Sequence, residues 1–460
     1  MRSRVVLATL VATLAATVGA GTAHGHELPG GFSMTLTPIS FELDDQKMGD
    51  LRTAARASAP VAASGSASCV SGMAAEFPCK NVNLLGHLSL AEIGGGEIGN
   101  DIWGWVDPST DREYAIMGKT NGTAFVDITN PREPRFVAHL PTQAEGSRMF
   151  WRDIKVYKDH AFVVSEHFNH GMQVFDLTRL RQFRDADSPA TVQADTVYHG
   201  VSNTHNLDIN TESGFAYLVG TNTCASKVES GGLHMVDIRD PQNPTFAGCA
   251  VVESPAKARN NYVHDSQCVN YDGPDARYHG REICFGSNEN AVVIYDVTDK
   301  SDPEVISETT YKTASYTHQG WLAQGGRYFV FNDELDELDG VAPEGRQTTY
   351  IVNVEDLDKP GKVMSSPNNT TSTDHNLYVK NRVIYESNYT SGLRLFDEDT
   401  VPSGDLRELG YFDLYPENDA PGFEGGTWSN FSRYRDDDIV AVSSIDRGLF
   451  VLETDVGGNG

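Results

Sequence analysis

The chain has 460 residues, a formal net charge of −28 at pH 7 and 39% hydrophobic residues. This hydrophobic content can bury a large core and excludes wholesale disorder. The negative charge opposes binding to the phosphate backbone of nucleic acid and to anionic lipid, so we expect neither as a partner. It favours solubility or the attraction of cations.

The N-terminal residues have the pattern of a secretory signal. Met1–Arg4 is basic, Val5–Val18 is apolar, and Gly21–Ala23 offers small residues for cleavage, so we predict a signal peptide over residues 1–23. Residues 24–68 are expected to form a flexible leader, because they become rich in Ala and Ser. The later sequence contains no apolar run long enough for a membrane span, and residues 455–460 form a short tail without an anchor. We expect a secreted, extracellular protein, with the periplasm or the cell surface as alternatives.

Export permits disulfides, and the chain has six cysteines. Six cysteines allow fifteen pairings. Proximity in the sequence suggests Cys69 with Cys79, Cys224 with Cys249, and Cys268 with Cys284. No CxxC motif occurs, which argues against a zinc ribbon, so we expect all of them to be structural.

A strand followed by an Asx-Pro turn repeats along the chain. Val126-Asp-Ile-Thr-Asn-Pro131 recurs as Val236-Asp-Ile-Arg-Asp-Pro241, and weaker copies follow near Asp296, Asn353 and Asp397. Alternating apolar residues predict a strand in each copy, and the Asx residue with its prolines predicts the turn that ends it.

The strand starts upstream of these turns share one register, roughly 55 residues apart, which is longer than a WD40 repeat. In the first unit the expected strands are 103–106, 113–117, 123–128 and 135–140. Four short antiparallel strands repeated seven times predict an all-β, seven-bladed β-propeller over residues 101–454. The seven register positions are Asp101, Trp151, His205, His264, His318, His375 and Trp428.

The last unit offers only three strands before the chain ends. Residues 82–90 resemble an outer strand, so we predict that they pair with Gly448–Glu453 and close the ring. Without this closure the last blade would expose a sheet edge. Residues 69–100 are therefore interpreted as a disulfide-bounded segment with the closing strand.

Two features resemble a known family. The segment from Cys69 to Cys79, running into Asn81–Leu85, and the later Asp101-Ile-Trp-Gly-Trp105 resemble the choice-of-anchor B family of secreted bacterial proteins. The Val-Asp-Ile-Thr-Asn-Pro unit is similar to the LVIVD repeat, a propeller-blade motif found in that family. The resemblance covers about residues 69–453 and implies an exported propeller. Family members typically carry a C-terminal anchor, which we do not recognise here, so release is expected. The resemblance supplies no catalytic residues.

His205, His264, His318 and His375 should meet at one mouth of a wet channel, because first strands begin on one face of a propeller. Second strands end on the same face. Imidazoles and carboxylates that converge there are ligand types for zinc, copper, iron or manganese, so a divalent metal is a candidate cofactor. The alternative is that these residues only hydrogen-bond neighbouring blades.

Further residues are expected at this mouth because of their positions at strand starts or second-strand ends. Arg152 could bind an anion or pair with Asp153, and the two tryptophans could wall a ligand. The acidic run from Asp333 to Gly340 is interpreted as a solvated insertion. The additional mouth candidates are Trp151, Arg152, Glu166, His167, Asn222, Glu289, Asp333, Glu334, Glu386 and Trp428.

The leading functional hypothesis is an exported propeller that binds an extracellular ligand or a partner protein without catalysis, acting as a monomer. No nucleophile elbow, HExxH helix or phosphate-binding loop is present in the sequence. The alternative is a metal-dependent hydrolase, lyase or oxidase that uses the four histidines.

Overall fold

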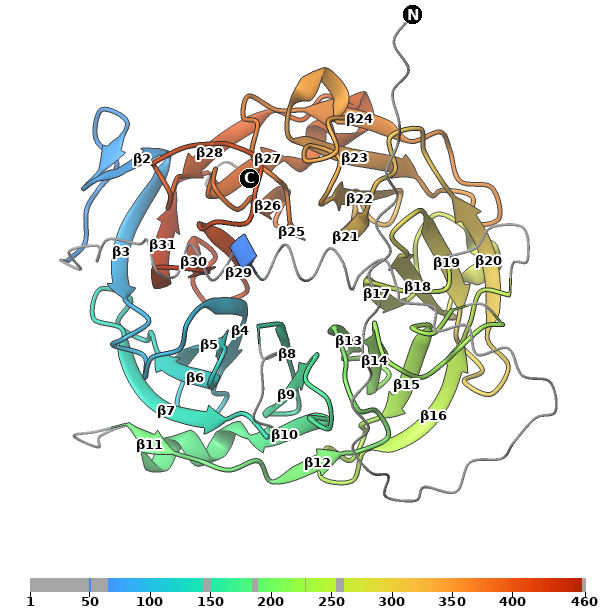
Figure 1. Ribbon diagram of the computed structural model, residues 1–460, viewed down its shortest axis with the longest axis horizontal. Helices are drawn as coiled ribbons and strands as arrows, with labels where there is room; N and C mark the ends of the chain where they lie inside the picture. Colours follow the sequence, from blue (N-terminus) through green and yellow to red (C-terminus); the bar gives the residue numbers. More distant parts are fainter. Residues whose placement is uncertain are drawn as a thin grey trace, which may run out of the picture.

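The computed structural model describes residues 49–50, 65–143, 150–183, 189–227, 229–253 and 260–456. The predicted signal peptide, most of the predicted leader and the end of the tail lie outside the described residues. The chain forms a ring of seven antiparallel sheets, which confirms the predicted seven-bladed propeller (Figure 1). Short 3-10 helices lie in the connections: η1 (Leu177–Gln182), η2 (Ala276–Tyr278), η3 (Pro343–Gly345) and η4 (Glu398–Ser403).

Each of the first three blades begins with a strand at the channel and ends with a strand at the rim. Blade one contains β4 (Gly99–Val106), β5 (Glu113–Lys119), β6 (Gly122–Asp127) and β7 (Arg135–Pro141), with β11 (Ala190–Thr191) added beside β7. Blade two contains β8 (Arg152–Tyr157), β9 (His160–Ser165), β10 (Met172–Asp176) and β12 (Thr196–Tyr198). Blade three contains β13 (Asn206–Asn210), β14 (Phe215–Val219), β15 (Leu233–Asp237) and β16 (Thr245–Ala250).

Blades four to six repeat this order. Blade four contains β17 (Asp265–Asn270), β18 (Glu282–Ser287), β19 (Val292–Asp296) and β20 (Glu304–Thr309). Blade five contains β21 (Thr317–Ala323), β22 (Tyr328–Asp333), β23 (Thr348–Asn353) and β24 (Met364–Pro367). Blade six contains β25 (Asn376–Lys380), β26 (Val383–Ser387), β27 (Leu393–Asp397) and β28 (Glu408–Phe412).

Blade seven is shared between the two ends of the described chain. It contains β29 (Thr427–Phe431), β30 (Ile439–Ser444) and β31 (Gly448–Thr454), and its outer strand is β3 (Val82–Leu88). β3 pairs antiparallel with β31, from Val82 opposite Thr454 to Leu88 opposite Leu449. The predicted closing strand is therefore confirmed, and the ring has no open edge between its first and last blades.

Two short strands before β3 extend blade six, which the sequence did not predict. β1 (Met73–Ala74) pairs with β2 (Phe77–Lys80), and β2 pairs with β28. Phe77 is buried with its ring centroid 5.4 Å from the rings of both Phe412 and Phe450. The N-terminal segment thus packs across the junction between blades six and seven before it closes the ring.

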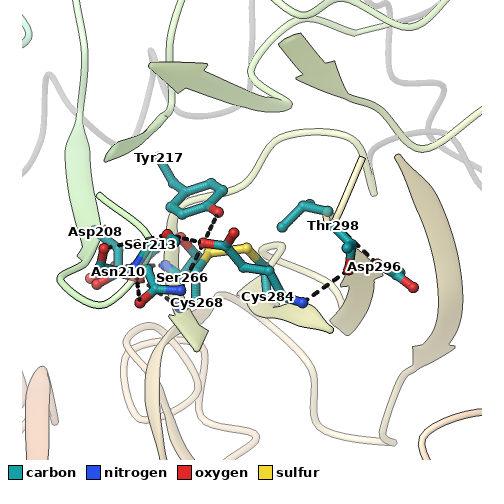
Figure 2. The surroundings of a disulfide bond; sticks show 12 residues. Asp208, Asn210, Ser213, Tyr217, Ser266, Cys268, Cys284, Asp296 and Thr298 are labelled. Carbon is teal, nitrogen blue, oxygen red and sulfur yellow. Dashed lines mark hydrogen bonds between the residues drawn. A yellow bond between two sulfur atoms is a disulfide. The ribbon is translucent and has the colours of Figure 1, made fainter. Parts of the chain in front are cut away.

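The three disulfides join the pairs that proximity suggested: Cys69–Cys79, Cys224–Cys249 and Cys268–Cys284. Cys268 and Cys284 lie directly opposite each other on β17 and β18. Figure 2 shows this bond beside Tyr217 of blade three, whose hydroxyl donates a 2.5 Å hydrogen bond to Glu282. Three disulfides are typical of an oxidising compartment outside the cytoplasm. None of the helices in the described residues is long and apolar enough to cross a membrane.

The repeated Asx-Pro turns connect the third and fourth strands of a blade. In blade one, Asp127 accepts hydrogen bonds from the backbone N–H and the hydroxyl of Thr129 at 3.0 and 2.6 Å, and β7 begins after Pro134. The closing strand packs on this turn at Gly86, where an added Cβ would lie 2.4 Å from the carbonyl oxygen of Pro131. The turn therefore joins the last two strands of one blade and packs against the outer strand of the neighbouring blade.

Side-chain oxygens on the first strands tie each of five blades to the next. Each oxygen accepts the backbone N–H of the following first strand, at distances between 2.6 and 3.0 Å. We call these residues the inter-blade belt. The pairs are Asp101 with Ile154, Asp153 with Leu207, Asp208 with Cys268, Gln267 with Leu322, and Gln319 with Leu377.

Removing core volume from the closing strand should weaken the whole ring. Leu84 is 5% exposed and packs between blades six and seven. We expect Leu84→Ala to lower the free energy of unfolding by about 2–5 kcal/mol, because it leaves a cavity where the two ends of the chain meet. Urea denaturation followed by fluorescence measures this change.

Val70→Ala is the matched control, because Val70 is 67% exposed in the same N-terminal segment. It should change the free energy of unfolding by less than about 0.5 kcal/mol. Equal effects of the two substitutions would contradict a stabilising role for closure.

Candidate metal centre

The four histidines stand at the starts of the first strands of blades three to six. His205, His264 and His375 directly precede β13, β17 and β25, and His318 is the second residue of β21. Their rings form a continuous row with centroids 4.2, 4.1 and 4.4 Å apart from His205 to His375. We call this row the histidine arc. It lies on the face where the first strands begin, which we call the mouth face.

Glu334 meets the arc from the end of β22. One of its carboxylate oxygens lies 3.5 Å from Nε2 of His318, and the other lies 3.7 Å from Nε2 of His375. Ligand atoms of His264, His318 and Glu334 all lie within 4.8 Å of one another. All four of these side chains are buried. Two or three imidazoles and one carboxylate in such proximity are a donor set that suits a divalent transition metal.

Backbone carbonyls orient two of the imidazoles. Nδ1 of His264 lies 2.8 Å from the carbonyl oxygen of His318, and Nδ1 of His375 lies 2.5 Å from that of Trp428. Because a carbonyl only accepts, these geometries assign the ring proton of the neutral imidazole to Nδ1 and make Nε2 its unprotonated nitrogen. A second hydrogen bond of this kind is typical of metal-binding histidines. The same bonds also link neighbouring blades.

The ends of the arc differ. At one end, Nδ1 of His205 lies 2.5 Å from a carboxylate oxygen of Glu166. At the other end, the rings of Trp428 and Tyr389 lie 5.0 and 4.6 Å from His375, and the Tyr389 hydroxyl donates a 2.5 Å hydrogen bond to Glu334. The carboxylate of Glu334 is therefore held in place by a buried phenol.

An apolar cluster encloses the arc on the mouth face. The sequence suggested a wet channel mouth, but the histidines are buried, with exposures from 1% to 8%. Loops of several blades bring large side chains together above the first strands, so water has little access to the arc. The cluster consists of Ile98, Phe150, Trp151, Tyr316, Leu335, Tyr389, Phe423, Trp428 and Ile445.

Arg152 does not pair with Asp153, which was one of the two roles considered for it. It is 2% exposed, its Nε donates to the carbonyl oxygen of Lys119 at 2.8 Å, and its Nη1 lies 3.1 Å from Nε2 of His170. Burial lowers the pKa of Arg152 to about 10, and burial together with this guanidinium lowers the pKa of His170 to about 3. Asp153 pairs instead with Lys155 at 2.5 Å. Arg152 thus ties blade two to blade one.

Three other candidates lie apart from the arc or act through their backbone. His167 makes a 2.6 Å contact from Nδ1 to the carbonyl oxygen of Phe168. Asn222 is exposed and accepts the N–H of Ser202 at 3.2 Å. Glu289 has a positive φ of 53° and exchanges backbone hydrogen bonds with Thr317 of the next blade. These contacts connect neighbouring segments of the fold.

Asp333 and Glu386 are buried but do not meet the arc as metal ligands. Asp333 accepts the N–H groups of Ser315 and Tyr316 at 2.8 and 2.6 Å, and burial raises its pKa to about 6. It therefore fixes the segment that leads into β21. Glu386 lies on β26 and accepts the hydroxyl of Thr349 from blade five at 2.7 Å.

A second group of carboxylates surrounds Glu386 at the junction of blades five and six. The interpretation of residues 333–340 as a solvated insertion is wrong for its first half, because Asp336 is fully buried and Glu337 is 9% exposed. Burial raises the pKa of Asp374, and the negative charges of Glu337, Asp336 and Glu386 raise it further. We call Asp336, Glu337, Asp374 and Glu386 the carboxylate cluster.

Lys155 occupies the channel behind the arc, and the sequence did not single it out. Burial lowers its pKa, but the carboxylates of Asp153 and Asp101 outweigh this effect and hold the pKa well above its ordinary value. The ammonium lies 4.7 Å from the ring centroid of Trp103. A cavity in the channel is lined by these charged groups together with Trp151, His205, His318, His375 and Trp428. In the sequence, the only indication of this charged group was a lysine at a position of β8 that faces the channel.

Comparisons with known proteins show the fold and no family. No family model matches the chain, and no curated protein matches it. Among solved structures, Kuenenia stuttgartiensis hydrazine synthase matches with a TM-score of 0.52 and 11% identity, over 77% of this chain and 95% of that chain. The extracellular domain of the one component system BT4673 from B. thetaiotaomicron matches with a TM-score of 0.50 and 14% identity, over 81% of this chain and 42% of that chain. At these identities the similarity establishes the propeller architecture alone.

The belt residue Asp208 should make stability depend on pH. Burial raises its pKa from an ordinary 3.8 to about 7. Between pH 3.8 and 7 the folded protein binds more protons at Asp208 than the unfolded chain does. The contribution of Asp208 to the free energy of unfolding is therefore fully present below about pH 4 and is lost as the pH rises through 7. The loss is roughly 4 kcal/mol at most. We expect the free energy of unfolding, measured by urea denaturation, to fall less between pH 4.5 and 7.5 in Asp208→Asn than in the native protein.

The comparison uses the difference between the two proteins, because other buried carboxylates titrate in both. Asparagine keeps an oxygen that can accept the N–H of Cys268. Identical pH dependence in the two proteins would contradict a shifted pKa at Asp208.

Proposed function

We propose that this chain is an exported metalloprotein that binds a divalent transition metal ion at the mouth of its propeller channel. The observation that carries the proposal is the meeting of His264, His318 and Glu334, whose ligand atoms lie within 4.8 Å of one another in a buried position. Zinc and copper are the preferred candidates, because imidazole nitrogen suits both ions and two imidazoles with one carboxylate are a donor set of catalytic zinc sites.

His375 extends this donor set. Its Nε2 lies 3.7 Å from Glu334, which supports a role as a fourth ligand or as a proton acceptor beside the metal. With three protein ligands, the ion would keep a position for water or a small molecule, as in catalytic zinc sites. Such an ion would supply Lewis-acid chemistry, and the enclosing aromatic side chains would restrict the ligand to a small one.

Of the two hypotheses from the sequence, only the metal-dependent enzyme requires a bound ion. The geometry supports the premise of the metal-dependent enzyme, which is a bound ion. The binding protein without catalysis stays the alternative, in which the ion only organises the mouth face. Turnover that requires the loaded metal would distinguish the enzyme from the binding protein.

We also propose membership of the choice-of-anchor B family with LVIVD-type repeats, and secretion to the extracellular space. The repeated turns after β6 and β15 and the closing segment from Cys69 support the first proposal. The disulfides support the second, because such bonds are stable in oxidising compartments.

Elemental analysis of protein purified without an affinity tag tests the metal centre. We expect a stoichiometric amount of zinc or copper after loading and dialysis. His264→Ala and His318→Ala should each lose most of the bound metal, because each removes one of the three ligands. Cobalt loading should give the visible absorption of a tightly bound ion in the native protein only.

His160→Ala is the matched control, because His160 bonds to Lys158 and Gln242 on the surface. It should keep the full metal content. A native protein that retains no transition metal after loading, or arc variants that retain it fully, would refute the metal centre.

A further inference from the structure

The carboxylate cluster gathers four acidic side chains from three separate segments. Asp336 and Glu337 lie in the connection between β22 and β23, Asp374 lies two residues before β25, and Glu386 lies on β26. Gln347, which precedes β23, places its amide nitrogen 3.5 Å from Asp374 and 3.4 Å from Glu386. The fold therefore brings these groups together between blades five and six.

Asp336 and Glu337 each have one carboxylate oxygen that accepts a hydrogen bond from blade five and one that does not. The Tyr350 hydroxyl donates to Oδ2 of Asp336 at 2.5 Å, and the N–H of Thr348 donates to Oε1 of Glu337 at 3.1 Å. The remaining oxygens are buried and accept no hydrogen bond from a group outside the cluster among the described residues, while the carboxyl groups of Asp336 and Glu337 share a hydrogen bond with each other. These remaining oxygens are Oδ1 of Asp336, Oε2 of Glu337 and Oδ1 of Asp374, together with Oε1 of the fully buried Gln347.

No basic side chain balances this charge in the described part of the chain. Asp336, Glu337 and Asp374 form no salt bridge there, and Arg394, which acts on Glu386 at longer range, is paired with Glu408 at 2.9 Å. The channel carboxylates, in contrast, surround Lys155. Burying several carboxylates without a cation is costly, so the cluster lacks a positive charge that its shape could accept.

We propose that the carboxylate cluster binds a calcium ion. Carboxylate and amide oxygens without imidazole are the donors that a hard cation prefers, whereas the histidine arc offers the mixed donors of a transition metal. Asp336, Glu337 and Asp374 would supply the charged ligands, and Gln347 would turn its amide oxygen inward. The bound ion would hold the connection that begins at Glu334 against blade six.

Terbium luminescence tests the site on the full chain after treatment with a chelator. Tyr350, which contacts Asp336, should sensitise a bound terbium ion, and calcium should displace that ion. We expect Asp374→Asn and Glu337→Gln each to weaken calcium binding at least tenfold. Without calcium, both variants should be as stable as the native protein or more stable, because a like charge is removed; this also shows that they fold.

Thermal unfolding gives a second readout. Calcium should raise the melting temperature of the native protein, since it binds the folded state, and should raise that of the two variants much less. Asp356→Asn is the matched control, because Asp356 belongs to an exposed acidic group that Arg277 already pairs. It should bind calcium as the native protein does.

The outcomes separate this site from the transition-metal centre. His318→Ala should keep calcium binding while it loses zinc or copper, so either site can fail without the other. No calcium-dependent change in luminescence or melting temperature would overturn the proposal. Calcium binding that both cluster variants retain, or that Asp356→Asn abolishes, would also overturn it.

Discussion

The ring depends on hydrogen bonds that pass from one first strand to the next at five junctions between blades. Asp153 accepts the N–H of Leu207 at 2.7 Å, and Gln319 accepts that of Leu377 at 2.8 Å. Strands within a blade pair with one another, but first strands of neighbouring blades lie too far apart for a ladder, so side-chain oxygens must satisfy these buried N–H groups. The belt uses carboxylates for part of this task, and Lys155 compensates their charge in the channel.

This constraint separates structural from chemical roles on the mouth face. Because Asp and Gln side chains supply the belt, histidine is not needed to join the blades. The imidazoles of His264 and His375 use Nδ1 to contact the neighbouring blade, and Nε2 of His375 lies 3.7 Å from Glu334. A purely structural role accounts for the Nδ1 contacts, whereas the proximity of His264, His318 and Glu334 also suits a metal ion.

Prediction from the sequence succeeded where the signal was local and repeated. The Asx-Pro turn after Val126 and the pairing of Cys268 with Cys284 follow from patterns within a few tens of residues. The closing strand around Leu84 followed from the repeat itself, because the last unit lacked its fourth strand. It was less successful where a side chain has a choice of neighbours. Arg152 turned toward His170 rather than Asp153, and the acidic run after Asp333 was buried rather than solvated.

The sequence by itself determined the architecture, because periodic strands and turns of fixed chemistry leave few ways to bury their apolar faces. It also placed the four histidines on one face, since their register repeats from blade to blade. Only the tertiary structure decided which carboxylate meets them. Glu334 and Glu386 were both expected where second strands end, but Glu334 follows β22 and approaches the arc, whereas Glu386 lies within β26 and joins Asp374 and Gln347. That choice depends on contacts between blades, which a single sequence does not encode in its local pattern.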